Sequence, residues 1–103
     1  MAGILNGKVG LVTGGASGIG RAAAIAMARE GAHLVVTDRA EESATATVEL
    51  INAAGGSAIA FGGDVTNEGD VAAMVAQAVA VFGRIDCAFN NAGINSRAVG
   101  PAD

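Results

Sequence analysis

Four residue types are rare or absent in this sequence. Its 103 residues include one cysteine, one proline and neither tryptophan nor tyrosine. Because the single cysteine, Cys87, cannot form a disulfide within the chain, we expect a reducing compartment and a buried packing role for Cys87. No apolar run approaches the ~18 residues that span a bilayer, and no basic segment precedes a long apolar one at the N-terminus. These absences predict a cytoplasmic protein with no membrane partner.

Positive charge is scarce as well. Lys8 is the only lysine, and the formal net charge is −4 at pH 7. A protein that binds nucleic-acid phosphates would carry clustered lysine and arginine, so we expect no nucleic-acid partner. The one histidine, His33, stands at the start of an apolar run and is predicted to lie at the surface. We predict no metal site.

Apolar and small residues are abundant instead. Hydrophobic residues make up 51% of the chain, 16% of residues are charged, and there are 16 glycines. This mixture is typical of tightly packed α/β proteins and differs from that of disordered chains. At this length we expect one domain over residues 1–103.

One stretch, residues 9–20 with the sequence VGLVTGGASGIG, organises the rest of the chain. It begins with β-favouring residues in a short run, which suits a strand buried on both faces of a parallel sheet. The run ends at the glycines Gly14, Gly15, Gly18 and Gly20. Glycine allows positive φ and lets a phosphate lie against the main chain. A helix that starts here points its unpaired N–H groups at the loop, which predicts a pyrophosphate site.

Apolar runs and helical patterns alternate along the chain. Strands are predicted at residues 8–13, 33–38, 57–62 and 85–90. Helices are predicted from residue 17 or 18 to 30, at 40–54, and from an N-cap at Thr66 to Phe82, with Gly83 ending the last. Because each crossover is long enough for a helix, we predict a doubly wound parallel α/β sheet, Rossmann-like but truncated, with strand order 3-2-1-4. Right-handed crossovers place the first two helices on one face and the third on the other.

The spacing of apolar residues predicts which side of each helix faces the sheet. The first helix is predicted to use Ile19, Ala23, Ala26 and Met27, and the second Val48 and Ile51. The third is predicted to use Val71, Met74, Val75, Ala78, Val79 and Phe82. Met74 and Phe82 are therefore assigned to the core and not to a cofactor site.

The glycine spacing, Thr13-Gly14-x-x-x-Gly18-x-Gly20, differs from the usual Gly-x-Gly-x-x-Gly of dinucleotide-binding folds. Together with the sequence NNAG at residues 90–93, it resembles the short-chain dehydrogenase/reductase family, whose glycine motif is TGxxxGIG and whose fourth strand ends in NNAG. The resemblance covers nearly the whole chain, but only the N-terminal, cofactor-binding portion of the family's fold. It implies an NAD(P)-dependent oxidoreductase that transfers hydride between the cofactor and a small alcohol or carbonyl substrate, in a parent protein that is a homo-oligomer.

In a doubly wound sheet the ligand binds outside the carboxyl ends of the strands. The pyrophosphate is predicted to lie on the glycine loop, with the Ser17 hydroxyl and the Ile19 N–H as donors. The predicted loop contacts are Gly14, Ser17, Gly18, Ile19 and Gly20. Two polar residues, Thr13 and Asn90, are expected to join the first and fourth strands.

Asp38 follows Gly20 at close to the ~20-residue spacing expected of an acid that accepts hydrogen bonds from the adenosine ribose. A 2′-phosphate beside this carboxylate would meet like-charge repulsion, which favours NAD over NADP. Arg39 is the next residue, and its positive charge weakens that inference. The alternative for Asp38 is a solvated acid at a strand end.

The resemblance to the family also implies contacts at two later strand ends. The Asp64 side chain and the Val65 main chain would contact the adenine. Asn91, Ala92 and Gly93 would border the adenine and nicotinamide riboses.

The residues that catalyse the family's reaction are missing. The family places a serine, a Tyr-x-x-x-Lys motif and a further asparagine downstream of NNAG, and this chain has no tyrosine. We therefore interpret the chain as the N-terminal portion of a dehydrogenase and predict that it has no catalytic residues and is inactive alone. Residues 94–103 show no periodic apolar pattern and are predicted to form a loose tail.

Two other classes of protein fit parts of the pattern. A non-catalytic nucleotide-binding or regulatory module would use the same pocket. A methyltransferase-like nucleotide site also combines a glycine loop with an acid on the second strand, but NNAG and the GxxxGxG spacing argue against it.

Overall fold

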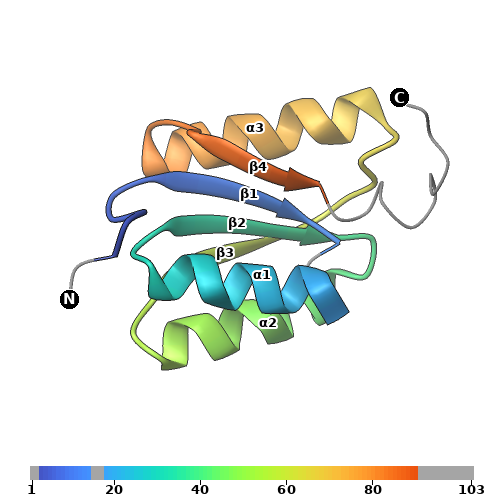
Figure 1. Cartoon of the computed structure of the whole chain (residues 1–103). Helices are drawn as coiled ribbons and strands as arrows, with labels where there is room; N and C mark the ends of the chain where they lie inside the picture. Colours follow the sequence, from blue (N-terminus) through green and yellow to red (C-terminus); the bar gives the residue numbers. More distant parts are fainter. Residues whose placement is uncertain (1–2, 15–17, 91–103) are drawn as a thin grey trace, which may run out of the picture.

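The structure is a computed structural model that describes residues 3–14 and 18–90. Strands and helices alternate in the predicted order (Figure 1): β1 (Val9–Thr13), α1 (Gly18–Arg29), β2 (His33–Asp38), α2 (Glu41–Ala53), β3 (Ser57–Gly62), α3 (Glu68–Phe82) and β4 (Cys87–Asn90). The predicted tail at residues 94–103 lies outside the described residues.

The starts of β1 and β4 differ from the prediction. We expected these strands to begin at residues 8 and 85, and they begin at Val9 and Cys87. The Val9 N–H, which a longer β4 strand would bond through its backbone, donates instead to the side-chain oxygen Asp86 Oδ2 at 2.8 Å. The β1–β4 ladder therefore starts only at the next pair, Gly10 opposite Cys87.

The four strands form one parallel sheet in the predicted order, β3-β2-β1-β4. Val12 at the centre of β1 lies opposite Val36 of β2 and Phe89 of β4. Every residue of β1 is buried, as expected of a strand covered on both faces. The predicted fold class, a doubly wound parallel α/β sheet, is confirmed.

Helices cover the two faces of the sheet as predicted, with α1 and α2 on one side and α3 on the other (Figure 1). Val12, Leu34 and Val36 point to the α1–α2 side and are fully buried. Each such side chain contributes roughly 1.5–3 kcal/mol to stability. Leu11 and Val35 point to the other side, where they pack against the α3 residues Met74 and Ala78. Val48 and Ile51 of α2 are buried, as predicted.

The prediction for the inner side of α1 is partly wrong. α1 buries Gly20 and Ala24, whereas Ile19 is 66% exposed and Ala26 is also exposed. The small residues face the sheet because they let the helix axis approach the strands closely. Met27 is half-buried against the same cluster, as expected.

The prediction assigned too many α3 residues to the side of the helix that faces the sheet. Met74 and Ala78 are buried, but Val75 and Val79 are exposed. Among the described residues α3 is the one helix on its face of the sheet, so its second apolar row has no neighbouring helix to pack against. Phe82 is half-buried in the α3-side cluster, which agrees with a core role.

The N-cap of α3 is Asn67 and not Thr66. Asn67 Oδ1 accepts a 2.9 Å hydrogen bond from the Asp70 N–H, which satisfies one of the free donors of the first turn. The Thr66 N–H and hydroxyl both donate to Asp64 Oδ1, at 2.9 and 2.6 Å, which places Thr66 in the turn before the helix. Gly83 ends the helix as predicted, with φ of +87°.

Two single residues also differ from expectation. His33 was predicted at the surface, but its ring stacks on Phe82 with centroids 5.3 Å apart, and its Nδ1 is buried with no hydrogen-bond partner in the described part of the chain. The start of β2 therefore lies under the last turn of α3. Cys87 was predicted to be buried and is only partly so, with Sγ 4.0 Å from the Val9 carbonyl oxygen. Within residues 3–14 and 18–90, no helix is long and apolar enough to cross a membrane.

Candidate functional site

The carboxyl ends of the four parallel strands lie at one edge of the sheet, which we call the carboxyl edge (Figure 1). It is defined by the last residues of the strands, Thr13, Asp38, Gly62 and Asn90. Eight of the predicted site residues are described, and each belongs to a strand end, a following loop or the first turn of α1 at this edge. They are Gly14, Gly18, Ile19, Gly20, Asp38, Arg39, Asp64 and Val65. Ser17, Asn91, Ala92 and Gly93 lie outside the described residues.

The two glycines that flank residues 15–17, Gly14 and Gly18, have the positive φ that was expected at the loop between β1 and α1. Gly14 and Gly18 have φ of +65° and +59°. A Cβ atom added at Gly18 would meet no atom of the described residues within 4 Å. Any side chain at Gly18 would therefore be strained by its backbone conformation and would fill the space next to the start of α1.

The first turn of α1 differs in charge from those of the other helices. α2 begins with Glu41 and Glu42, and α3 has Glu68 and Asp70 in its first turn, whereas α1 has no acidic residue there. Acidic side chains near a helix N-terminus neutralise the partial positive charge of the free N–H groups. At α1 these groups lack an acid in their own turn, which suits an external anion.

Ile19 and Gly20 occupy this first turn with opposite exposures. Gly20 is buried against the sheet, while the Ile19 side chain faces outward. The Ile19 side chain makes no contribution to the core, so the folding of α1 does not account for a large apolar residue at this position. Its place next to the glycine loop agrees with a contact to a bound molecule.

Asp38 ends β2 and is half-buried. Its Oδ1 accepts a 3.2 Å hydrogen bond from the Ala40 N–H, and its backbone carbonyl accepts a 3.1 Å bond from the Gly63 N–H. These bonds fix the carboxyl group between the end of β2 and the start of α2. Ala40, the N-cap of α2, has no side-chain cap, so Asp38 partly takes over that role.

Arg39 and Asp64 form an ion pair across the ends of β2 and β3. Arg39 Nη2 lies 3.2 Å from Asp64 Oδ2, and the two side chains are 74% and 34% exposed. Hydrogen bonds from Thr66 hold the pKa of the Asp64 carboxyl below its ordinary value, and the charge of Arg39 lowers it further. Asp64 is therefore ionised at neutral pH.

Sequence reasoning did not predict this ion pair or the residues that hold Asp64. Asp70 Oδ2 accepts a 2.9 Å bond from the Asp64 N–H, and Thr66 binds the Asp64 carboxylate. An acid followed two residues later by threonine is a local turn signal that could have identified the Thr66 contact. Val65 lies between Asp64 and Thr66 in the sequence, and its side chain is half-buried against the core cluster on the α3 side of the sheet.

Two threonines at the carboxyl edge show different hydrogen bonding. Thr13 Oγ1 donates to the Phe89 carbonyl at 3.4 Å, so Thr13 links β1 to β4 as predicted, whereas the predicted contact of the Asn90 side chain lies outside what the structure describes. Thr37, opposite Thr13 in the ladder, is fully buried, and its hydroxyl has no hydrogen-bond partner among the described residues. Sequence reasoning missed Thr37, although a polar residue inside the apolar run HLVVTD is a visible signal.

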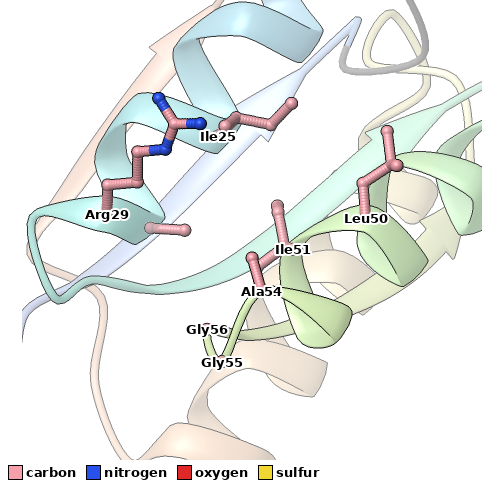
Figure 2. Close-up of a pocket in the computed structure, with 8 residues that line it drawn as sticks. Ile25, Arg29, Leu50, Ile51, Ala54, Gly55 and Gly56 are labelled. Carbon is pink, nitrogen blue, oxygen red and sulfur yellow. The ribbon is translucent and has the colours of Figure 1, made fainter.

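A cavity of about 460 Å³ lies elsewhere, between the C-terminal halves of α1 and α2. Figure 2 shows Ile25 and Arg29 of α1 facing Leu50 and Ile51 of α2 across it. It contains none of the predicted site residues, because α1 runs away from the glycine loop. In the described ranges, no group of three or more His, Cys, Asp or Glu residues is arranged to hold a metal ion.

The sequence matches the model of the short chain dehydrogenase family over residues 8–102, and the chain belongs to this family. It is 48% identical over 90 residues to 2,5-dichloro-2,5-cyclohexadiene-1,4-diol dehydrogenase of Sphingobium indicum, a match that covers 87% of this chain and 35% of that protein. It is 47% identical over 91 residues to momilactone A synthase of Oryza sativa, covering 88% and 32%. The family uses NAD or NADP as cofactor.

Solved structures agree with the family and the fold. A hydroxysteroid dehydrogenase from Escherichia coli superposes with a TM-score of 0.82 at 36% identity, covering 84% of this chain and 37% of that one. The chain thus spans about a third of the length of these relatives. Another relative is covered over most of its length. The chain is 44% identical over 92 residues to the short-chain dehydrogenase/reductase homologue YusS of Bacillus subtilis, and the match covers 88% of this chain and 84% of YusS.

Proposed function

We propose that this chain is the NAD-binding portion of a short-chain dehydrogenase whose whole protein transfers hydride between NAD and a small alcohol or carbonyl compound. The observation that carries the proposal is the glycine loop at the start of α1. Gly14 and Gly18 have positive φ there, no described atom lies within 4 Å of a Cβ built at Gly18, and α1 has no acid in its first turn. A backbone surface of this kind suits a pyrophosphate, which needs close approach and N–H donors.

The residues that we assign to the cofactor follow the carboxyl edge. We assign Gly14, Ser17, Gly18, Ile19 and Gly20 to the pyrophosphate, Asp38 and Arg39 to the adenosine ribose end, Asp64 and Val65 to the adenine, and Asn91, Ala92 and Gly93 to the two riboses. Asp64 Oδ1 already accepts two bonds from Thr66, so an adenine amine would have to share Oδ2 with Arg39. When bound, the nicotinamide ring supplies the hydride donor or acceptor.

We propose NAD as the preferred cofactor. The Asp38 carboxylate is an acceptor for the hydroxyl groups of a ribose and would repel a 2′-phosphate. Arg39, the cation next to it, is paired with Asp64 at 3.2 Å, which supports the same preference.

The proton transfer that accompanies hydride transfer would be done by residues outside this chain. The sequence contains no tyrosine. Its single lysine, Lys8, precedes β1 and so lies at the amino-terminal ends of the strands, opposite the carboxyl edge. No group in the described site is placed as a tyrosine–lysine pair would need to be. We propose that the parent protein supplies these groups, is a homo-oligomer and is cytoplasmic, and that the chain alone has no activity.

A second candidate is a non-catalytic nucleotide-binding or regulatory module. The length of YusS favours it, because the match to this chain covers 84% of that relative. Both candidates use the same site. The coding sequence beyond codon 103 separates them, because a downstream Tyr-x-x-x-Lys indicates the dehydrogenase.

Calorimetric titration of the chain with NAD tests the shared part of both candidates. We expect binding by the wild type and no measurable binding by Gly18→Val, whose side chain would fill the space next to the α1 N-terminus. Gly55→Val is the matched control, since Gly55 has φ of +93° and the same open surroundings but follows α2 at the far end of that helix. Equal binding by the two variants, or none by the wild type, would contradict the proposal.

A further inference from the structure

We propose that Asp64 is a positioning residue that withholds the Arg39 guanidinium from a 2′-phosphate and so strengthens the preference for NAD over NADP. The inference rests on the proposed function, because it assumes that the adenosine end of the cofactor lies next to Asp38. It assigns to Asp64 a role in cofactor choice in addition to its adenine contact.

Asp64 is held in place independently of Arg39. Its Oδ1 accepts bonds of 2.9 and 2.6 Å from Thr66, and its own N–H donates to Asp70 Oδ2 at 2.9 Å. The remaining oxygen, Oδ2, is the one that faces Arg39 Nη2 at 3.2 Å. The carboxylate is thus a fixed anchor, and the long, exposed arginine side chain is the mobile partner that adapts to it.

Arg39 is the residue that would otherwise recognise a phosphate at this position. Guanidinium groups bind phosphate oxygens in pairs, and an arginine near the end of the second strand is the usual device that accommodates a 2′-phosphate. Arg39 directly follows Asp38 and is 74% exposed, so its reach is not limited by packing. The ion pair with Asp64 instead holds the Arg39 guanidinium near the end of β3.

The charges around Arg39 add to the effect. Asp38 and Asp64 are close to it on β2 and after β3, and the Glu41 side chain lies against Gly62 at the end of β3. This end of the sheet therefore carries three carboxylates, Asp38, Glu41 and Asp64, beside one guanidinium, which pairs with Asp64. A 2′-phosphate, with a charge of about −1.5 to −2 at neutral pH, would enter a region of net negative charge.

Stability alone does not explain the pair. An ion pair with one partner mostly exposed contributes little to folding, because solvent screens it. Its larger consequence is the direction in which the Arg39 charge points. A merely structural pair would alter the affinities for NAD and NADP equally when broken, whereas a positioning role alters their ratio.

The test measures dissociation constants for NAD and NADP by calorimetry in wild type, Asp64→Asn, Arg39→Ala and the double variant. Asparagine keeps an oxygen for Thr66, but its Nδ2 replaces the Oδ2 atom that an adenine amine would use, so this contact is lost for both dinucleotides alike. We expect Asp64→Asn to raise the ratio of NADP affinity to NAD affinity by about three- to tenfold, because the lost adenine contact cancels in the ratio and the released guanidinium favours NADP alone. In the Arg39→Ala background the gain should vanish, because it depends on the released guanidinium. Asp64→Glu, which keeps the charge, should keep the wild-type ratio.

Two results would overturn the inference while leaving the proposed function intact. The first is an unchanged ratio of NADP affinity to NAD affinity in Asp64→Asn, and the second is the same gain in this ratio in the Arg39→Ala background; in both cases wild-type NAD binding persists. If the wild type binds neither dinucleotide, the proposed function fails and the inference fails with it. Circular dichroism checks the fold of each variant, and Asp64→Ser, whose hydroxyl also accepts from Thr66, carries the test if Asp64→Asn does not fold.

Discussion

The Asn52 side chain of α2 forms hydrogen bonds with both backbone groups of Ala58 in β3. Its Nδ2 donates to the Ala58 carbonyl at 3.2 Å, and its Oδ1 accepts from the Ala58 N–H at 3.0 Å. β3 is an edge strand, and Ala58 is 7% exposed, so water cannot replace these bonds easily. One amide side chain thus takes the place of a neighbouring strand and blocks this part of the sheet edge.

We expect Asn52→Ala to lower the free energy of unfolding by about 1–2 kcal/mol, because it leaves a buried donor and a buried acceptor without partners. Urea denaturation measures the change. Asn52→Asp should fall between the wild type and Asn52→Ala, since aspartate still accepts from the N–H but repels the carbonyl. Glu49→Ala, at an exposed position one turn earlier in α2, controls for helix propensity and should have little effect. An Asn52→Ala variant as stable as this control would show that the edge contact contributes nothing.

Acid should weaken the junction between β1 and β4 through Asp86. Hydrogen bonds from Arg84 and from the Val9 N–H lower the pKa of Asp86 below its ordinary value of 3.8. A lowered folded-state pKa means that the stabilisation is complete above the unfolded value and is lost as the pH falls through the folded value. We therefore expect stability to decline below about pH 4, and Asp86→Asn to be less stable at pH 7 and to decline less steeply.

Thermal unfolding at several pH values measures this slope. Asn in place of Asp86 can still accept from Val9, so the difference isolates the charge and the contact with Arg84, whose Nη2 lies 2.6 Å from Asp86 Oδ1. Asp64 also has a lowered pKa and contributes to the same pH range in both proteins. Parallel pH curves for wild type and Asp86→Asn would rule out the assigned role of Asp86.

The order of the elements, and the face of the sheet that each helix covers, could be predicted because they depend on patterns within short segments and on the handedness of crossovers. Apolar runs such as LVV at residues 34–36 require burial on both faces, and the intervening helical segments require parallel pairing. The positive φ of Gly14 and Gly18 follows in the same way from the need for a tight turn between strand and helix.

Contacts between distant side chains could not be predicted in this way. The stacking of His33 on Phe82 depends on how far α3 extends over the sheet, and the hydrogen bond from the Val9 N–H to Asp86 depends on the register of β1 and β4. No local pattern records either. The prediction of the α3 N-cap was wrong for a related reason. Thr66 and Asn67 are both residue types that cap helices well, and Thr66 is held in a turn by its hydrogen bond to Asp64, so Asn67 is the cap. The Arg39–Asp64 pair likewise needs the register of β2 and β3.

We expect no dehydrogenase activity from the chain alone. Hydride transfer from an alcohol needs a group that takes the proton, and hydride transfer to a carbonyl needs a group that gives it; the sequence has no tyrosine to do so. The assay follows NADH absorbance with a panel of secondary alcohols, and a complete short-chain dehydrogenase with its own substrate is the positive control. Turnover above background, in material free of a full-length contaminant, would refute the assignment.

The preference for NAD should depend on the Asp38 carboxylate. Asp38→Ala removes charged hydrogen bonds to the ribose and should weaken NAD binding by about 1 to 3 kcal/mol, while it relieves the repulsion of a 2′-phosphate. The ratio of the NAD and NADP affinities should therefore narrow or reverse in calorimetric titrations. Asp38→Asn is the matched control, because its side-chain oxygen can still accept from the Ala40 N–H at the start of α2. It should keep the local fold, lose the charge and shift the ratio in the same direction. If Asp38→Ala leaves the ratio unchanged, Asp38 is only a solvated acid at the end of β2, and the assignment of NAD fails with it.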